Sequence, residues 1–198
     1  SAAVSADINV AANLSGAKVA LGGNGIVTEI YKAATDNHYY VVQIQPTLAK
    51  VTAATTRRAT ASVGAYTEYT IGGHTYKQFS TTVTSADKDT LTGTVAKNDW
   101  VMIYGYKDGE TYYGVATPAT TVTGKVTGYS SSAKSFTIDG TAYALSAATV
   151  ADGATKLSTD KVSYTDSKTY AIDAYGNVVG TLTASANKDH VLVLRATG

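Results

Sequence analysis

The residues most able to do chemistry in this chain are three histidines, His38, His74 and His190. None of them stands in an HxH or HExxH spacing, the pattern with which one element supplies two zinc ligands. The chain also has no cysteine, which excludes disulfides and thiolate metal sites. We therefore expect each histidine to be a strand or surface residue, and we predict no metal site and no cofactor.

The acidic residues form two patterns. Asp87 and Asp89 resemble the start of a calcium loop, but the further oxygen ligands and the glycine at the bend are missing. Asp99 and Asp166 each precede a strand-like run, where an aspartate typically caps a turn. No GxSxG elbow, Ser/His/Asp set or glycine-rich phosphate loop occurs, and GGNG (22–25) is typical of a hairpin turn. The sequence thus predicts no catalytic residue and a protein that is not an enzyme.

Aromatic residues are the remaining candidates for binding, since the chain has 15 Tyr, 2 Phe and 1 Trp. On a strand, the adjacent Tyr112 and Tyr113 must face opposite sides. Trp100, Tyr112 and Tyr113 could stack on sugars, which makes them candidate glycan contacts. The alternative, which we favour, is that these rings fill small β cores and cover seams between units.

Charge restricts the partners. The 16 Lys and Arg residues nearly balance the 15 Asp and Glu residues, so we predict no nucleic-acid partner. No apolar run reaches the roughly 18 residues of a membrane helix, and we predict no membrane insertion. Arg57 and Arg58 form a small basic patch that could touch anionic cell-wall polymers.

The elements that would position these residues are repeated. YTIGGHTYKQFSTTV (69–83) matches FTIDGTAYALSAATV (136–150) at a shift of 67 residues. Lys50-Val51-Thr52 matches Lys125-Val126-Thr127 at a shift of 75, so the first copy is longer by eight residues between these two matches. A weaker match relates residues 18–45 to the last part of the second copy.

Turn signals define the strands of the repeat. Gly72-Gly73 and Asp139-Gly140 predict tight hairpins, because a type I′ turn requires positive φ at both central residues. Further hairpins are predicted over 18–34, 100–116 and 168–184. Short strands separated by frequent turns are typical of sandwiches and small barrels.

We therefore predict an all-β fold of tandem small β-barrel modules, SH3-like or OB-like, of about 70 residues each, with little or no helix. The predicted modules are residues 46–119 and 120–198. Residues 1–45 are either a partial β unit that belongs to a preceding module or strands that complete the first one. The join at 117–120 is too short for free swinging, which predicts a rigid rod.

The string TGKVTGYSSSAKSFTIDGTAYAL (123–145), followed by the hairpin KTYAIDAYGNVVGTL (168–182), carries a family resemblance. It resembles the β-rich repeat regions of bacterial cell-surface and S-layer-like proteins that contain S-layer homology (SLH) domains. The resemblance covers most of 46–198 and includes no SLH anchoring domain. It implies a secreted, non-enzymatic protein at the cell surface or in the cell wall of a bacterium, and it carries over no catalytic or binding residue.

The expected function is a structural or spacer segment of such a cell-surface protein, with self-association or cell-wall polysaccharide as its partners. The alternative is a carbohydrate-binding module of a surface adhesin or secreted enzyme, with Trp100, Tyr112 and Tyr113 as the contacts.

Overall fold

The computed structural model describes residues 4–9, 23–32, 38–81, 88–108, 110–151 and 153–183. This described part is built from short strands and contains no helix, which confirms the predicted all-β class. It accordingly contains no helix long and apolar enough to cross a membrane.

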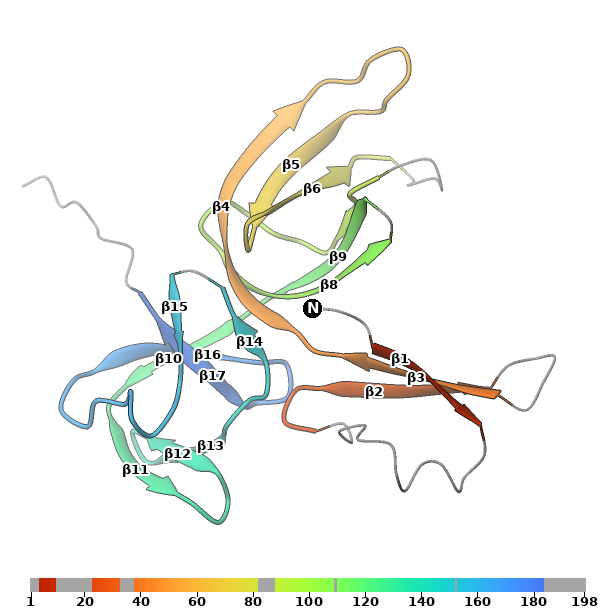
Figure 1. The fold of residues 1–198 in the computed structure, drawn as a ribbon. Helices are drawn as coiled ribbons and strands as arrows, with labels where there is room; N and C mark the ends of the chain where they lie inside the picture. The colour runs from red at the N-terminus through yellow and green to blue at the C-terminus, as the bar shows by residue number, and fades with distance from the viewer. Residues whose placement is uncertain are drawn as a thin grey trace, which may run out of the picture.

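The strands fall into three parts along the chain (Figure 1). The N-terminal sheet contains β1 (Val4–Asn9), β2 (Val27–Lys32) and β3 (His38–Ile44). What we call the first group contains β4 (Thr47–Arg57), β5 (Tyr66–Ile71), β6 (His74–Phe79), β7 (Leu91–Thr92), β8 (Trp100–Asp108) and β9 (Thr111–Pro118). The second group contains β10 (Thr120–Gly124), β11 (Val126–Ser130), β12 (Ser135–Ile138), β13 (Thr141–Ala144), β14 (Thr149–Val150), β15 (Ala154–Lys156), β16 (Lys168–Ile172) and β17 (Val178–Leu182).

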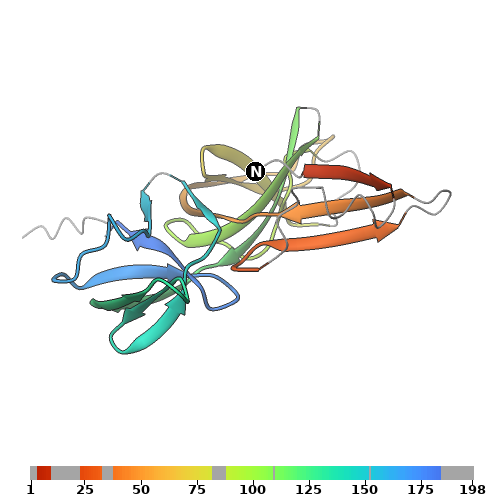
Figure 2. The ribbon, with the colours of Figure 1, turned by 60° about the horizontal axis from the view of Figure 1, so that its bottom comes forward.

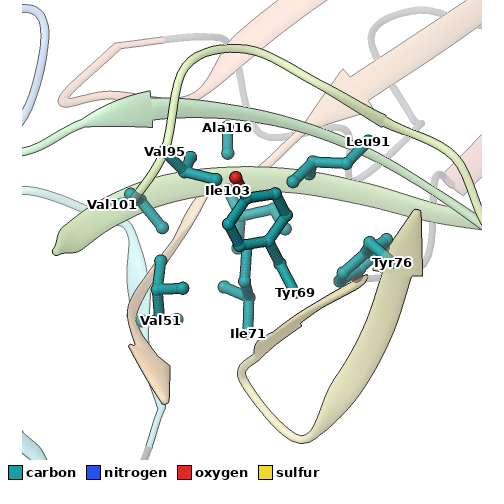
Figure 3. Close-up of a cluster of buried hydrophobic side chains, with 10 residues drawn as sticks. Val51, Tyr69, Ile71, Tyr76, Leu91, Val95, Val101, Ile103 and Ala116 are labelled. Carbon is teal, nitrogen blue, oxygen red and sulfur yellow. The ribbon is translucent and has the colours of Figure 1, made fainter. Parts of the chain in front are cut away.

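The first group is one curved sheet in the order β6-β5-β4-β8-β9-β7. Its long strand β4 pairs with β8 through its first half and with β5 through its second half. A β-bulge after Val51 separates the halves, and bulges increase the bend of a strand. Apolar side chains therefore meet between the two halves of the sheet (Figure 3). The buried cluster consists of Ala49, Val51, Tyr69, Ile71, Tyr76, Leu91, Val95, Val101, Ile103 and Ala116.

The second group repeats this plan with the long strand divided in two. β10 pairs with β16, and β11 pairs with β12, with Lys125 between them. Two sheets result, β10-β16-β17-β15 and β11-β12-β13. Their shared core consists of Val126, Phe136, Ile138, Leu157, Tyr170, Ile172 and Val178.

Pairing registers agree between the groups through most of the repeat. The matched pairs are Thr47–Ile103 with Val122–Tyr170, Val51–Ile71 with Val126–Ile138, and Tyr69–Tyr76 with Phe136–Tyr143. The bulge also recurs at the equivalent residue of β11. Both predicted type I′ turns are confirmed, with φ of 57° and 85° at Gly72-Gly73 and 44° and 84° at Asp139-Gly140.

The last hairpin breaks the repeat. Ile103 pairs with Ala116, but its counterpart Tyr170 pairs with Thr181, two residues short of the position that the shift of 67 would give. The β8–β9 turn is tight, whereas the β16–β17 turn is a wider loop around Asp173.

The described sheets are open, and no closed barrel is present. In the first group, a single bridge between Lys77 and Thr90 joins the two ends of the sheet, and the Lys77 N–H donates to Asp89 O at 2.6 Å. Strand β7 is only two residues long, and Asp89 has a positive φ of 55°, so a full ladder does not form there.

The N-terminal sheet has the order β1-β3-β2, with both pairs antiparallel. Figure 2 shows it extending to one side of the two groups. Strand β3, which contains the run YYVVQI, pairs with β1 and β2 and with no described strand of the first group. In the described chain, these strands therefore form a separate sheet that leads through Gln45 and Pro46 into β4.

Candidate functional site

The histidines do not converge. The ring of His74, at the β5–β6 turn, stacks on Tyr112 with centroids 4.3 Å apart and meets Tyr76 edge-on at 6.4 Å. His38 begins β3, where the backbone alone is described, and His190 lies outside the described residues. Within the described part of the chain, no group of three His, Asp or Glu residues could hold a metal ion.

The candidate carboxylates that the structure describes accept hydrogen bonds from neighbouring N–H and hydroxyl groups. Asp89 Oδ1 accepts the Tyr112 N–H at 3.0 Å, while Asp87 lies outside the described residues. Asp99 Oδ2 accepts the N–H of Ala96, three residues earlier, at 2.8 Å. Asp166 accepts the hydroxyl of Ser163, also three residues earlier, at 2.8 Å.

The hydrogen bonds from Ser163 and Thr165 lower the pKa of the Asp166 carboxyl below its usual value. Hydroxyl donors stabilise the charged form, as is expected for a capping carboxylate. Asp99 therefore caps a turn through a backbone N–H, as predicted, whereas the Asp166 carboxylate accepts hydroxyl groups and the Ser163 hydroxyl accepts the Asp166 N–H.

The structure separates the three candidate glycan contacts. Trp100 pairs with Lys50 at one end of the β8–β9 hairpin, whereas Tyr112 pairs with Lys107 near the other. Trp100 and Lys107 are seven residues apart on β8, which corresponds to roughly 23 Å along the strand. Tyr112 packs against the first core, and Tyr113 faces the other side of β9. Trp100 therefore cannot share one sugar ring with the tyrosines.

Trp100 instead belongs to the seam between the two groups. The ring is partly buried against the apolar cluster there, and a Cβ on Gly153 would lie 3.4 Å from it. The Lys50 ammonium lies 5.9 Å from the ring centroid. This position agrees with the alternative in which aromatic residues cover seams.

A short parallel ladder crosses the seam. Strand β14 of the second group pairs with the start of β4, with Thr149 opposite Thr47 and Val150 opposite Leu48. Backbone hydrogen bonds continue it, from Thr149 N–H to Pro46 O at 3.0 Å and from Ala151 N–H to Leu48 O at 2.8 Å. The two groups thus share a hydrogen-bonded sheet.

An apolar cluster fills the seam beneath this ladder. Its fully or almost fully buried members are Leu48 and Met102 from the first group and Ala148, Ala171 and Val179 from the second. Sequence reasoning did not identify this cluster, because these residues read as ordinary inward positions of separate strands. Adjacent apolar residues such as Leu48-Ala49 and Val178-Val179 are buried on both faces of their strands, but the sequence does not show what covers the second face.

A cluster of hydrogen-bonded polar residues around Asp173 lies at one end of the seam. Asp173 is 5% exposed, and its Oδ1 accepts the N–H groups of Tyr175 and Asn177, both at 2.9 Å. Its Oδ2 accepts the Ser146 hydroxyl at 2.8 Å. The Lys156 ammonium donates to Ser146 O at 2.5 Å, and burial lowers the pKa of Lys156.

The turn at residues 23–26, just before β2, contacts the same polar cluster. The Ala147 N–H donates to Asn24 O at 2.7 Å, and Gln45 Nε2 donates to Ala147 O at 2.7 Å. Gly25 is required at this contact, because its φ is 89° and an added Cβ would lie 2.5 Å from Asp173 Oδ2. The N-terminal sheet, the first group and the second group therefore meet at one place.

Comparison with known proteins adds no family or function. Scans against family models, curated proteins and solved structures find no match to this chain.

Proposed function

We propose that this chain is a non-enzymatic structural or spacer segment of a bacterial cell-surface protein of the S-layer-like kind. The observation that carries the proposal is the seam, where a parallel ladder and a buried apolar cluster join successive groups. A spacer must transmit position and force, and a hydrogen-bonded, apolar junction resists bending more than a flexible linker does.

The repeat supports the same interpretation. The first and second groups share their bulge and the registers before the last hairpin, as expected for tandem small β-barrel modules of SH3-like or OB-like type that descend from one unit. The matched aspartates Asp99 and Asp166 each accept a hydrogen bond from the residue three positions earlier. Duplication of a scaffold together with its turns, rather than of a reactive centre, is typical of structural arrays.

Single-molecule force spectroscopy tests the mechanical role. With the chain held by its two ends, we expect the first and second groups to resist extension together and to unfold in one event. A variant with a weakened seam, Met102→Ala, should unfold in two separate steps at lower force. Two independent steps in the unmodified chain would contradict a spacer with a rigid junction.

The cellular location needs its own test. Antibodies raised against the chain should label intact, unpermeabilised cells of the source organism, while antibodies against a cytoplasmic protein should not. Labelling only after permeabilisation would refute the cell-surface assignment and leave the mechanical result standing.

The alternative of a carbohydrate-binding module loses its original contacts, because Trp100 and Tyr112 lie at opposite ends of their hairpin. A glycan screen with Trp100→Ala and Tyr113→Ala variants remains the direct test at those positions.

A further inference from the structure

The first group carries an extension that the second group lacks. In the second group, the β11–β12 hairpin ends at the pair Ser130–Ser135. The matching hairpin of the first group, β4–β5, continues for two more pairs, Thr56–Thr67 and Arg57–Tyr66. Its end projects beyond the other strands of the first group (Figure 1). The residues of the added pairs are half-buried or exposed and belong to no buried cluster, so core packing does not explain why the first group has them.

The added pairs lengthen a free edge of β4. Strand β8 pairs with β4 only from Thr47 to Lys50, and β5 covers the opposite edge of the second half of β4. The backbone of Val51 still bonds Asn98 and Asp99 on the β8 side. Beyond that residue, no described strand lies along this edge. An unpaired edge is a template on which another strand can pair.

The backbone groups that point to this edge can be identified from the neighbouring strands. The Lys77 N–H donates to a carbonyl of the segment before β7 at 2.6 Å, so Lys77 points away from β5. In the same cross-strand row, Glu68 therefore points to β4 and Thr55 points back to β5. Because these directions alternate along a strand, the N–H and C=O groups of Ala54 and Thr56 point to the free edge.

The free edge carries none of the usual obstacles to pairing. Natural edge strands are typically blocked by proline, by lysine or by a bulge within the edge. Residues 52–57 read TAATTR, with no proline or lysine, and the bulge of β4 lies at the start of this segment. Its single charge, Arg57, is paired with Glu68 at 2.9 Å between Nη2 and Oε2. The small side chains of Ala53 and Ala54 leave room for a neighbouring strand.

The second group does not have an equivalent edge. Tyr129 is the counterpart of Ala54, and the hairpin turns directly after Ser130. Strand β11 thus has one outward-pointing residue after its bulge, whereas β4 has two. The extension therefore supplies the second residue of a pairing edge, which gives it a role that core packing does not.

We propose that this edge pairs with the same edge of a second copy of the chain, in antiparallel direction about a two-fold axis at Thr55. This register places Ala54 opposite the partner's Thr56, and Thr56 opposite the partner's Ala54. Both are hydrogen-bonded pairs, because all of these residues point outward, and each pair exchanges both of its N–H···O bonds. The contact is isologous, as in most two-fold dimers.

A second copy is the occupant that fits because the edge is complementary to itself. The register sets Thr55 against the partner's Thr55, and such threonine pairs stabilise a sheet. It sets Arg57 against the partner's Ala53, so the two arginines stay roughly 13 Å apart along the strands. The whole chain is also nearly neutral, with 16 basic and 15 acidic residues, so copies do not repel each other strongly.

This contact goes beyond the spacer role and does not depend on it. Single-molecule force spectroscopy tests the junction within one chain, whereas the edge joins two chains, so either proposal can fail alone. In a surface layer, the contact would hold neighbouring chains side by side.

Sedimentation velocity and ¹H–¹⁵N correlation spectra of the full chain, from about 20 μM to 1 mM, test the proposal. An interface of a few strand residues is small, so we expect a dissociation constant on the order of 0.1 to 1 mM. The sedimentation coefficient should rise with concentration, and the amide signals of residues 52–57 should shift. The amides of Ala54 and Thr56 should gain protection from hydrogen exchange with concentration, whereas that of Thr55, already bonded to β5, should not.

Proline substitutions separate edge pairing from folding. Ala54→Pro removes an outward N–H and no hydrogen bond to β5, and proline is tolerated at such edge positions. It should weaken self-association at least about tenfold, and so should Thr56→Pro. The matched control is Ala54→Thr, which keeps the N–H and should associate within about twofold of the unmodified chain. Thermal unfolding shows that each variant is folded.

Three results would overturn the proposal. The first is a chain that sediments as a monomer at every concentration. The second is association of folded Ala54→Pro and Thr56→Pro as strong as that of the unmodified chain. The third is concentration-dependent shifts at another exposed apolar position, such as Ile30 or Tyr31 of β2, without shifts at residues 52–57.

Discussion

Truncation of Leu48 to alanine tests the seam most directly. The Leu48 side chain is 0% exposed and packs against residues of the second group, while its carbonyl accepts a hydrogen bond from Ala151. Leu→Ala removes three carbon groups, each worth about 0.8 kcal/mol of transfer free energy, or roughly 2.4 kcal/mol in all. The cavity left behind adds to this cost, so we expect a loss of about 3 to 4 kcal/mol in the free energy of unfolding.

Urea unfolding followed by two signals measures this change. Far-UV circular dichroism reports on all the strands, and fluorescence of Trp100, the single tryptophan, reports on the seam. In the unmodified chain, both signals should change together. In Leu48→Ala, the Trp100 signal should change at lower urea than the circular dichroism, because the seam opens before the cores unfold.

Val63→Ala is the matched control. Val63 is an aliphatic residue of the same group, lies in a loop and is 40% exposed, so its truncation should cost less than about 0.5 kcal/mol. A loss below about 1 kcal/mol for Leu48→Ala would refute the reasoning, because it would mean that the seam is not packed as described. Separate transitions for the two signals in the unmodified chain would refute it as well.

Three further changes have definite expected outcomes. Tyr170 is 0% exposed and its hydroxyl has no hydrogen-bond partner in the described structure, so Tyr170→Phe should leave stability unchanged or raise it by about 1 kcal/mol. Burial also raises the pKa of Tyr170 above 10.0, so this tyrosine ionises in the unfolded chain at a lower pH than in the folded chain. The free energy of unfolding therefore falls as the pH rises above 10.0. Urea unfolding at alkaline pH should show a smaller fall for Tyr170→Phe than for the unmodified chain. Burial lowers the pKa of Lys156 in the folded chain below the 10.5 of the unfolded chain. Between the folded pKa and 10.5 the unfolded chain binds more protons, so the free energy of unfolding rises with pH in that range. Lys156→Met should lack this rise when urea unfolding is compared at mildly and at strongly alkaline pH. Gly93 has a φ of 120°, and an added Cβ would lie 1.9 Å from Ala116 O, so Gly93→Ala should cost about 3 kcal/mol in thermal or urea unfolding. Gly73→Ala, which has a φ of 85° but no atom near the added Cβ, should cost only about 1 kcal/mol, and equal losses would contradict the steric argument.

The local structure of this chain could be predicted because short-range rules determine it. Asp139-Gly140 and Gly72-Gly73 form the expected turns, since few residue pairs tolerate positive φ at both positions. This two-residue turn at Asp139-Gly140 then fixes the register that places Phe136 opposite Tyr143. The capping role of Asp99 follows from the same local geometry.

The seam could not be predicted, because it depends on contacts between residues far apart in the chain. Nothing in the sequence around Leu48 shows that Ala148 and Val179 will cover it. The eight-residue excess of the first copy is visible in the sequence, but only the pairing of Thr56 with Thr67 and of Arg57 with Tyr66 shows that the added residues lengthen this hairpin.

The sequence alone therefore determined the strand class, the turns and the repetition, since these depend on backbone preferences and on alternation over a few residues. The tertiary structure decided which faces became buried, where the two groups joined and which aromatic residues met. Those outcomes depend on how strands from distant parts of the chain stack, and side-chain burial across such a junction has no local signature in the sequence.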